Sequence, residues 1–177
     1  MDKLSTFKDR IIRSAKLDIN VYEEVEADTN AMGQAMGVVI LSSIASGLGT
    51  FERGGFGGIL FGTAGALIGW FVWAYITYFI GTKIFPEPQT SSNPGELLRT
   101  IGFSSSPGLI KVLGIIPGLM GIVFIIASVW MFVAMVIAVR QALDYKSTLR
   151  AVGVCVIGWL IQVVFLLVIY SFVKVNI

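Results

Sequence analysis

The sequence predicts an all-α membrane protein: a polytopic helix bundle of five spans, the third broken by proline, preceded by an N-terminal amphipathic interfacial helix. Of its 177 residues 55% are apolar and only 14% are charged, whereas soluble domains carry about 25% charged residues. The mean hydropathy is +0.83, more than the core of a soluble globule of this size can hide. The apolar residues are also gathered into long, nearly uncharged stretches.

The first predicted element is a basic amphipathic helix over residues 4–17. Its apolar side chains recur at helical spacing, and its basic side chains lie mostly on the other side. The apolar set is Leu4, Phe7, Ile11, Ile12 and Ala15, and the basic set is Lys3, Lys8, Arg10, Arg13 and Lys16. Such a helix lies in the headgroup plane; packing against the protein's own cytosolic segments is the alternative. The spread charges and the missing apolar core do not fit a signal peptide.

An acidic run follows, and with the first helix it completes a cytoplasmic region over residues 1–30. The run contains no basic residue and consists of Asp18, Glu23, Glu24, Glu26 and Asp28. Asn20 and Glu23 fit a capping box, so a short helix is expected to begin at Asn20. We interpret the run as a solvated face, and docking of a basic partner is the alternative.

The membrane domain, residues 31–177, holds five apolar stretches, over residues 31–51, 55–82, 97–116, 118–140 and 148–173. About 20 apolar residues cross the hydrocarbon core as a helix, so four of the stretches are predicted spans on length alone. The third stretch contains Arg99 and Lys111 and is interrupted by Pro107.

The distribution of Lys and Arg favours five spans with a cytoplasmic N-terminus. In that arrangement ten basic residues are cytoplasmic and three are not, which fits the enrichment of basic residues in cytoplasmic loops. The cytoplasmic ten are Lys3, Lys8, Arg10, Arg13, Lys16, Lys83, Arg99, Arg140, Lys146 and Arg150, and the other three are Arg53, Lys111 and Lys174. If the third stretch failed to cross, the basic residues near position 145 would change sides and the bias would collapse.

The third span begins and breaks at recognisable residues. Asn93 can cap a helix that has Pro94 at its first position. Pro107 then frees the carbonyl of Phe103, and Pro117 cannot continue the helix either. Serine hydroxyls can satisfy freed carbonyls in lipid, and residues 104–106 are all serines. We interpret the break as structural; the alternative is a substrate site at a discontinuous helix, with Lys111 as its polar residue.

The side-chain inventory excludes much chemistry. The sequence contains no histidine, and its one cysteine, Cys155, lies in an apolar run, so histidine-based catalysis and metal binding are impossible. The four clear spans contain no Asp or Glu, the usual mark of ion and proton paths. We therefore expect no enzyme activity, no catalytic residue, no metal or other cofactor, no nucleic acid and no small-molecule substrate.

Small residues in the first two spans predict close helix packing. They are spaced four apart, which lets helix backbones approach one another. The candidates are Gly33, Gly37, Gly54, Gly58, Gly62, Gly65 and Gly69. Contact within one chain and contact with another chain both fit the spacing. The link of residues 49–58 is expected to be short and flexible, joining an antiparallel pair.

The broken span also carries a family resemblance. Gly102, Phe103, Ser104 and Pro107, followed by Pro117 and Gly118, resemble the glycine-aromatic-small-proline element of the Yip family (Rab-GTPase-interacting proteins) in its short prokaryotic form. The resemblance covers most of residues 30–173. The longer N-terminal region of eukaryotic members, with its Asp-Leu-Tyr-Gly-Pro motif, is missing, and Phe103 replaces the more usual tyrosine, so Rab binding is not carried over.

The resemblance implies a non-enzymatic membrane protein that binds other membrane proteins. Together with the composition, it predicts a membrane scaffold or accessory subunit that packs against partner membrane proteins, or against itself, and organises the bilayer. The alternative function is a small transporter or channel that uses the broken third span and Lys111.

Overall fold

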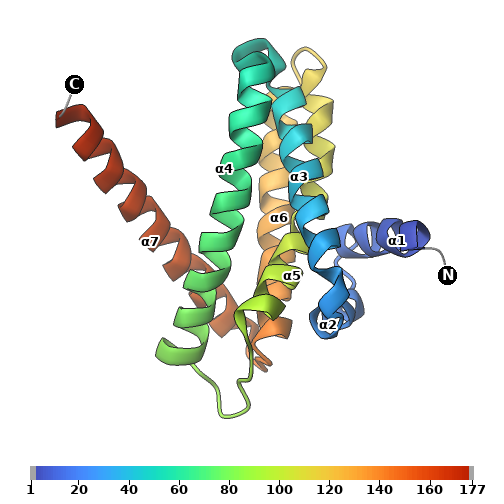
Figure 1. Ribbon diagram of the computed structural model, residues 1–177, viewed down its shortest axis with the longest axis vertical. Helices are drawn as coiled ribbons and strands as arrows, with labels where there is room; N and C mark the ends of the chain where they lie inside the picture. Colours follow the sequence, from blue (N-terminus) through green and yellow to red (C-terminus); the bar gives the residue numbers. More distant parts are fainter. Residues whose placement is uncertain (1–2, 176–177) are drawn as a thin grey trace.

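The computed structural model describes residues 3–175, with side-chain surroundings over residues 6–164, and this part of the chain is all-helical (Figure 1). The α-helices are α1 (Lys3–Ala15), α2 (Ile19–Ala27), α3 (Met32–Gly49), α4 (Phe51–Phe79), α5 (Pro94–Ser104), α6 (Met120–Ala142) and α7 (Thr148–Val175). Two short 3₁₀ segments, η1 (Thr29–Ala31) and η3 (Ser106–Ile115), and a π-helical turn, η2 (Ile80–Ile84), complete it. The predicted all-α class is confirmed.

Three helical stretches are long and apolar enough to cross a bilayer: Thr29–Gly49, Phe51–Ile84 and Met120–Ala142. The part of α7 over Thr148–Val164 is a shorter apolar helix. The chain is therefore an integral membrane protein. The count of five spans stays a prediction, because α5 and η3 are each too short to cross alone.

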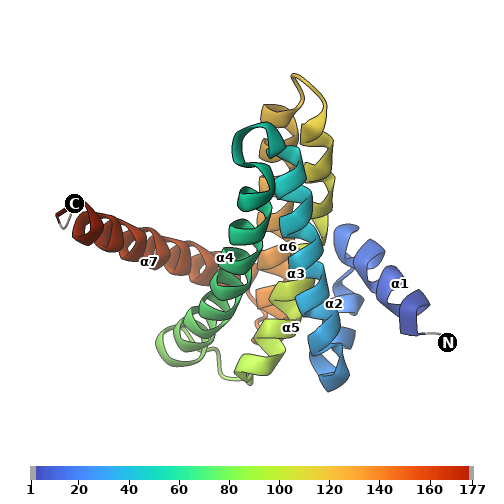
Figure 2. The same ribbon diagram turned by 45° about the horizontal axis from the view of Figure 1, so that its top comes forward.

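The long helices stand side by side, and two helices depart from them. α3, α4 and α6 run along one direction, with α5 and η3 filling the space between α3 and α6 (Figures 1 and 2). α1 extends to one side across this direction, and α7 spreads away from α4 toward its C-terminal end. The loops α4–α5 and α6–α7 gather at one end of the bundle, and the links α3–α4 and η3–α6 lie at the other.

The buried centre of the bundle is α5. Every residue of α5 from Leu97 to Ser104 is buried, including Arg99 and Thr100. The helix begins with the expected capping box, in which Asn93 Oδ1 accepts from the Glu96 N–H at 3.1 Å and Glu96 Oε2 accepts from the Asn93 N–H at 2.9 Å.

Two expectations about helix boundaries are wrong. α2 begins at Ile19 and is capped by Asp18, whose Oδ1 accepts from the Asn20 N–H at 2.9 Å, so the expected capping box at Asn20 does not form. The expected flexible link between α3 and α4 is mostly helical, because only Thr50 separates them. Gly55, with φ of 54°, bends the start of α4 instead.

Candidate functional site

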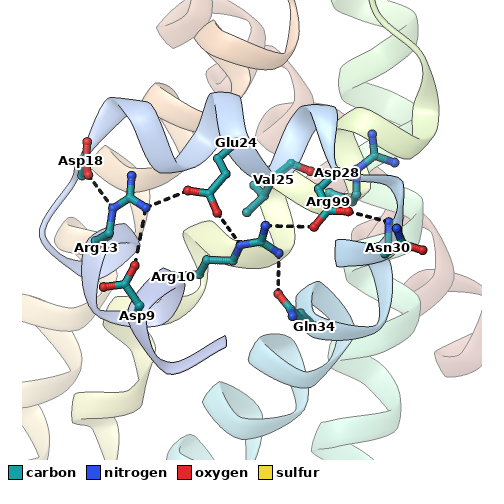
Figure 3. A network of polar contacts seen from close by, with 10 residues as sticks. All are labelled: Asp9, Arg10, Arg13, Asp18, Glu24, Val25, Asp28, Asn30, Gln34 and Arg99. Carbon is teal, nitrogen blue, oxygen red and sulfur yellow. Dashed lines mark hydrogen bonds and ion pairs between the residues drawn. The ribbon is translucent and has the colours of Figure 1, made fainter. Parts of the chain in front are cut away.

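Residues 3–31 form a compact unit, here called the N-terminal cap, whose ion pairs connect α1 to α2 (Figure 3). Arg10 is buried at its centre. Its Nε donates to Glu24 at 2.8 Å, its Nη2 pairs with Asp28 at 2.9 Å, and its Nη1 donates to Gln34 of α3 at 2.8 Å. One guanidinium thus connects α1, α2 and the first membrane helix.

Arg13 extends the same network along α1. It pairs with Asp18 at 2.8 Å and with Glu24 at 2.7 Å, and more loosely with Asp9 at 3.5 Å. Hydrogen bonds from Arg13 hold the pKa of the Asp18 carboxyl below its usual range, and those from Arg10 do the same for Asp28. Both carboxylates therefore stay charged at neutral pH and hold the cap together.

Arg99 of α5 attaches the cap to the bundle. Its Nε donates to the Val25 carbonyl at 2.9 Å, and its Nη2 donates to the carbonyl of Glu26. These carbonyls belong to the last turn of α2, where helical partners are missing. A buried side chain of α5 thus caps a helix that lies 73–74 residues earlier in the sequence.

Glu26 is the one poorly matched carboxylate of the cap among the described residues. Its Oε2 is buried and has no hydrogen-bond partner there. Burial, together with the nearby carboxylates of Glu23, Glu96 and Asp144, raises the pKa of Glu26 to about 8, and Arg99 only partly opposes the shift. A proton on this carboxyl at neutral pH removes the cost of a buried charge.

The cap also packs against the bundle through apolar contacts. The ring of Phe7 lies against Gly37 of α3, and Trp130 of α6 donates from Nε1 to the Ala15 carbonyl at 2.8 Å. Packing on the protein itself, the alternative for this helix, therefore occurs.

The interpretation of the acidic run as a solvated face is wrong for Asp18, Glu24 and Asp28, since each pairs with Arg10 or Arg13.

Two loops are tied together at the same end of the bundle. Glu87, in the loop before α5, accepts from the backbone N–H groups of Lys146 at 3.0 Å and Ser147 at 3.3 Å. Tyr145 Oη lies 2.9 Å from the Gly81 carbonyl and 2.7 Å from the Phe85 carbonyl. No local sequence pattern indicates these contacts, because they join residues about 60 positions apart.

The broken span satisfies its own carbonyls. Ser106 Oγ donates to the Phe103 carbonyl, the group that Pro107 frees, at 2.7 Å. Ser104 Oγ donates to the Ile101 carbonyl, also at 2.7 Å. This is the role expected for these serines. After η3 the chain turns past Pro117 through Gly118, whose φ of 84° suits glycine.

The comparison with protein families matches the Yip1 domain over residues 24–170. This range includes the broken span with its glycine-aromatic-small-proline element, and nearly all of the bundle. The chain belongs to the Yip family. Neither the curated proteins nor the solved structures gave a match.

The seven glycines predicted to pack at four-residue spacing in the first two spans are here called the predicted ladder. Within this Yip1 domain, the glycines in close contact mostly lie outside this ladder. A Cβ on Gly49 would lie 2.1 Å from the Lys111 carbonyl oxygen, and one on Gly108 would lie 2.1 Å from Ser42 Oγ. A Cβ on Gly102 would lie 2.8 Å from the Cβ of Ala35. These positions let η3 and α5 lie directly against α3.

The predicted ladder has free space beside it. An added Cβ meets nothing within 4 Å at Gly33, Gly54, Gly58, Gly62, Gly65 and Gly69, and at Gly37 it meets only the Phe7 ring. Contact within the chain therefore does not explain the spacing in α4. Contact with another chain stays a prediction.

The predicted polar residue of the third span, Lys111, lies on η3 near the α3–α4 end. It is half-buried, and its ammonium lies 5.6 Å from the centre of the Phe124 ring. Among the described residues it forms no ion pair. It lines a cavity of about 590 Å³ between α3, α4, η3, α6 and α7.

Proposed function

We propose that this Yip-family protein is a non-enzymatic scaffold or accessory subunit of a prokaryotic cytoplasmic membrane. It packs against partner membrane proteins, and through them organises the bilayer. Five spans place the N-terminal cap and both tied loops on the cytoplasmic side, with the α3–α4 link on the far side. Residues 1–30 and the membrane domain then act as one unit.

The observation that carries the proposal is the cap network of Arg10, Arg13 and Arg99. It fixes α1 and α2 on the bundle through charge-assisted hydrogen bonds, which are about twice as strong as neutral ones. A surface that is already ordered loses little conformational entropy when a partner binds. The cap therefore offers a fixed cytoplasmic contact surface beside the membrane.

The outer face of α4 supports a second contact, inside the bilayer. Gly54 and Gly65 carry no side chain and have free space beside them in this chain. Small residues of this kind let a partner helix approach closely. A partner can thus be held at two places, at the cap and along α4.

Quantitative recovery of partner membrane proteins tests the proposal. Wild-type protein, Arg10→Gln and the control Lys83→Gln would be purified in mild detergent at native abundance, and the recovered proteins compared by isotope-labelled mass spectrometry. We expect a membrane protein at near-stoichiometric amounts with wild type and Lys83→Gln, and several-fold less with Arg10→Gln.

Two results would count against the scaffold. One is recovery of no membrane protein above an unrelated membrane-protein control. The other is solute flux through liposomes containing the purified protein that Lys111→Gln abolishes while the protein still folds, which would indicate the transporter alternative.

A further inference from the structure

The cavity beside Lys111 is a long groove, partly open to the outside, between the apolar helices of the bundle. It extends along α4 from Gly58 to Trp73, a distance of about 22 Å at 1.5 Å per residue. This is most of the ~30 Å thickness of a hydrocarbon core. Its volume of about 590 Å³ lies within the range of sites that bind organic molecules.

The shape of the cavity comes from the missing side chains of α4. Gly58, Gly62 and Gly69 line one wall, and an added Cβ at each would meet no atom within 4 Å. The lining also includes Trp159 of α7. Because α7 diverges from α4 (Figure 1), an elongated molecule can enter sideways from the bilayer.

The two ends of the cavity differ in polarity. At the α3–α4 end lie Lys111, whose ammonium lies over the Phe124 ring, and the hydroxyl-bearing residues Ser46 and Thr50. At the other end lie Trp70 and Trp73. The arrangement suits an amphiphile, with a polar head at one end and an apolar body along the glycine wall.

Two polar groups of the lining lack partners among the described residues. Lys111 has no carboxylate within ion-pair distance there, and its ammonium contacts only an aromatic face, that of Phe124. Trp73 is 8% exposed, and its Nε1 is buried without an acceptor. A cation inside a membrane bundle normally pairs with an anion or a carbonyl, so the first of these points to an anionic occupant.

We propose that this cavity binds one anionic lipid, with its phosphate or carboxylate head at Lys111 and an acyl chain along Gly58, Gly62 and Gly69 toward Trp73. The head sits in the leaflet that contains the α3–α4 link. The occupant is a bilayer lipid and not a free anion, because the cavity beyond Lys111 is long and mostly apolar.

Native mass spectrometry of the delipidated full chain tests the site. The probes are phosphatidylglycerol, phosphatidylcholine with the same chains, oleate and inorganic phosphate. We expect one phosphatidylglycerol or one oleate per chain, bound on the order of tenfold more tightly than phosphatidylcholine, as one charge-assisted hydrogen bond provides. Which of the two binds identifies the head. Lys111→Gln should remove the preference, Lys111→Arg should keep it, and the surface control Lys146→Gln should not change it.

A matched pair of glycine variants tests the position of the chain. Gly62→Leu fills the cavity wall, whereas Gly65→Leu adds the same side chain one turn away, outside the lining. We expect Gly62→Leu to weaken lipid binding at least tenfold and Gly65→Leu to leave it unchanged. The proposal is overturned by an anionic preference that survives in Lys111→Gln, by equal effects of the two leucines, by inorganic phosphate binding as well as the lipid, or by a chain dimer in place of bound lipid.

Discussion

Arg10 and Arg99 are buried arginines that together hold the N-terminal cap on the bundle. Arg10 is 6% exposed and so is Arg99. Arg10 neutralises carboxylates, whereas Arg99 caps the carbonyl end of α2. A buried arginine is tolerated when all its neighbours are acceptors, and here these neighbours come from the acidic run and the last turn of α2.

Arg99→Gln should loosen the cap. It removes two hydrogen bonds to α2 carbonyls, and hydrogen bonds to a charged donor are worth about 1.5–3 kcal/mol each. We expect faster proteolysis between residues 16 and 31, while the bundle keeps its helical signal by circular dichroism. Lys83→Gln is the matched control, and cleavage at the wild-type rate in Arg99→Gln would contradict the assignment.

Glu26 should make the stability of the cap depend on pH. Its pKa is raised to about 8 in the folded protein from a usual value of 4.5, so the folded state holds a proton that the unfolded state has lost. The contribution of the protonated Glu26 carboxyl to stability is complete below the unfolded pKa of 4.5, and it is lost as pH rises through the folded pKa of about 8. Glu26→Gln should therefore raise the thermal midpoint by a few degrees at pH 8.5 and hardly at pH 4.5. A shift of equal size at both pH values would contradict the raised pKa of Glu26 in the folded protein.

Residue chemistry was predictable where the partner is near in sequence, and unpredictable where it is distant. Pro107 has no backbone N–H to donate to the Phe103 carbonyl, and the hydroxyl of the neighbouring Ser106 donates instead. This is a local rule. The pairing of Asp28 with Arg10 follows from a fold of α1 onto α2 that no local pattern encodes. The interpretation of the acidic run as a solvated face is therefore wrong for Asp28.

At the scale of elements, the third span is the feature that the sequence describes best. Asn93 and Pro94 start α5, and the helix changes to 3₁₀ geometry at Ser105. The serines make this break possible in an apolar environment, since the carbonyls of Ile101 and Phe103 each accept from a hydroxyl of their own segment.

A double-mutant cycle tests this account of the break. Ser106→Ala should destabilise the bundle by about 1–3 kcal/mol, because it leaves a buried carbonyl without a donor. In a Pro107→Ala background the backbone N–H at position 107 can serve the Phe103 carbonyl, so the cost of Ser106→Ala should shrink. Additive effects in thermal unfolding would contradict the shared carbonyl. Ser105→Ala is the control, as its hydroxyl makes no hydrogen bond within the described residues.

The glycine contacts give a second prediction for the elements. Gly49→Ala places a methyl group 2.1 Å from the Lys111 carbonyl oxygen, and such overpacking costs about 1–3 kcal/mol. Gly54→Ala, which meets nothing within 4 Å, should be neutral or slightly stabilising because alanine favours helix. Thermal unfolding of the pair separates them, and equal midpoints would contradict the packing of η3 on α3.

Spacing alone did not identify the packed glycines. A four-residue repeat describes one face of a helix, but it does not say whether that face meets protein, lipid or another chain. Gly49 and Gly108 are each required at a single crossing point with a distant segment. Only the positions of η3 against α3 reveal them.

At the scale of the whole molecule, the helical class, membrane character and family were within reach of the sequence. They depend on composition, on the length of apolar stretches and on one short motif around Pro107. The packing of the cap on the bundle could not be predicted from the sequence. It depends on contacts such as that of Arg99 with Val25, which join residues more than 70 positions apart. The account therefore depends on one arrangement: the cap and the loops of residues 85–93 and 143–147 share the cytoplasmic side of a five-span bundle.

Side-specific labelling of single cysteines tests that arrangement most directly. Glu23→Cys, Ser92→Cys and Lys146→Cys report the cap and the two loops, Glu52→Cys reports the far side, and the buried Cys155 is replaced by alanine in all four. Asn176, the expected far-side terminus, lies outside the described residues. The account predicts that an impermeant thiol reagent labels only position 52 in intact cells, and that positions 23, 92 and 146 react only after the cells are opened. Labelling of position 92 from outside, or of positions 23 and 146 from opposite sides, would contradict it.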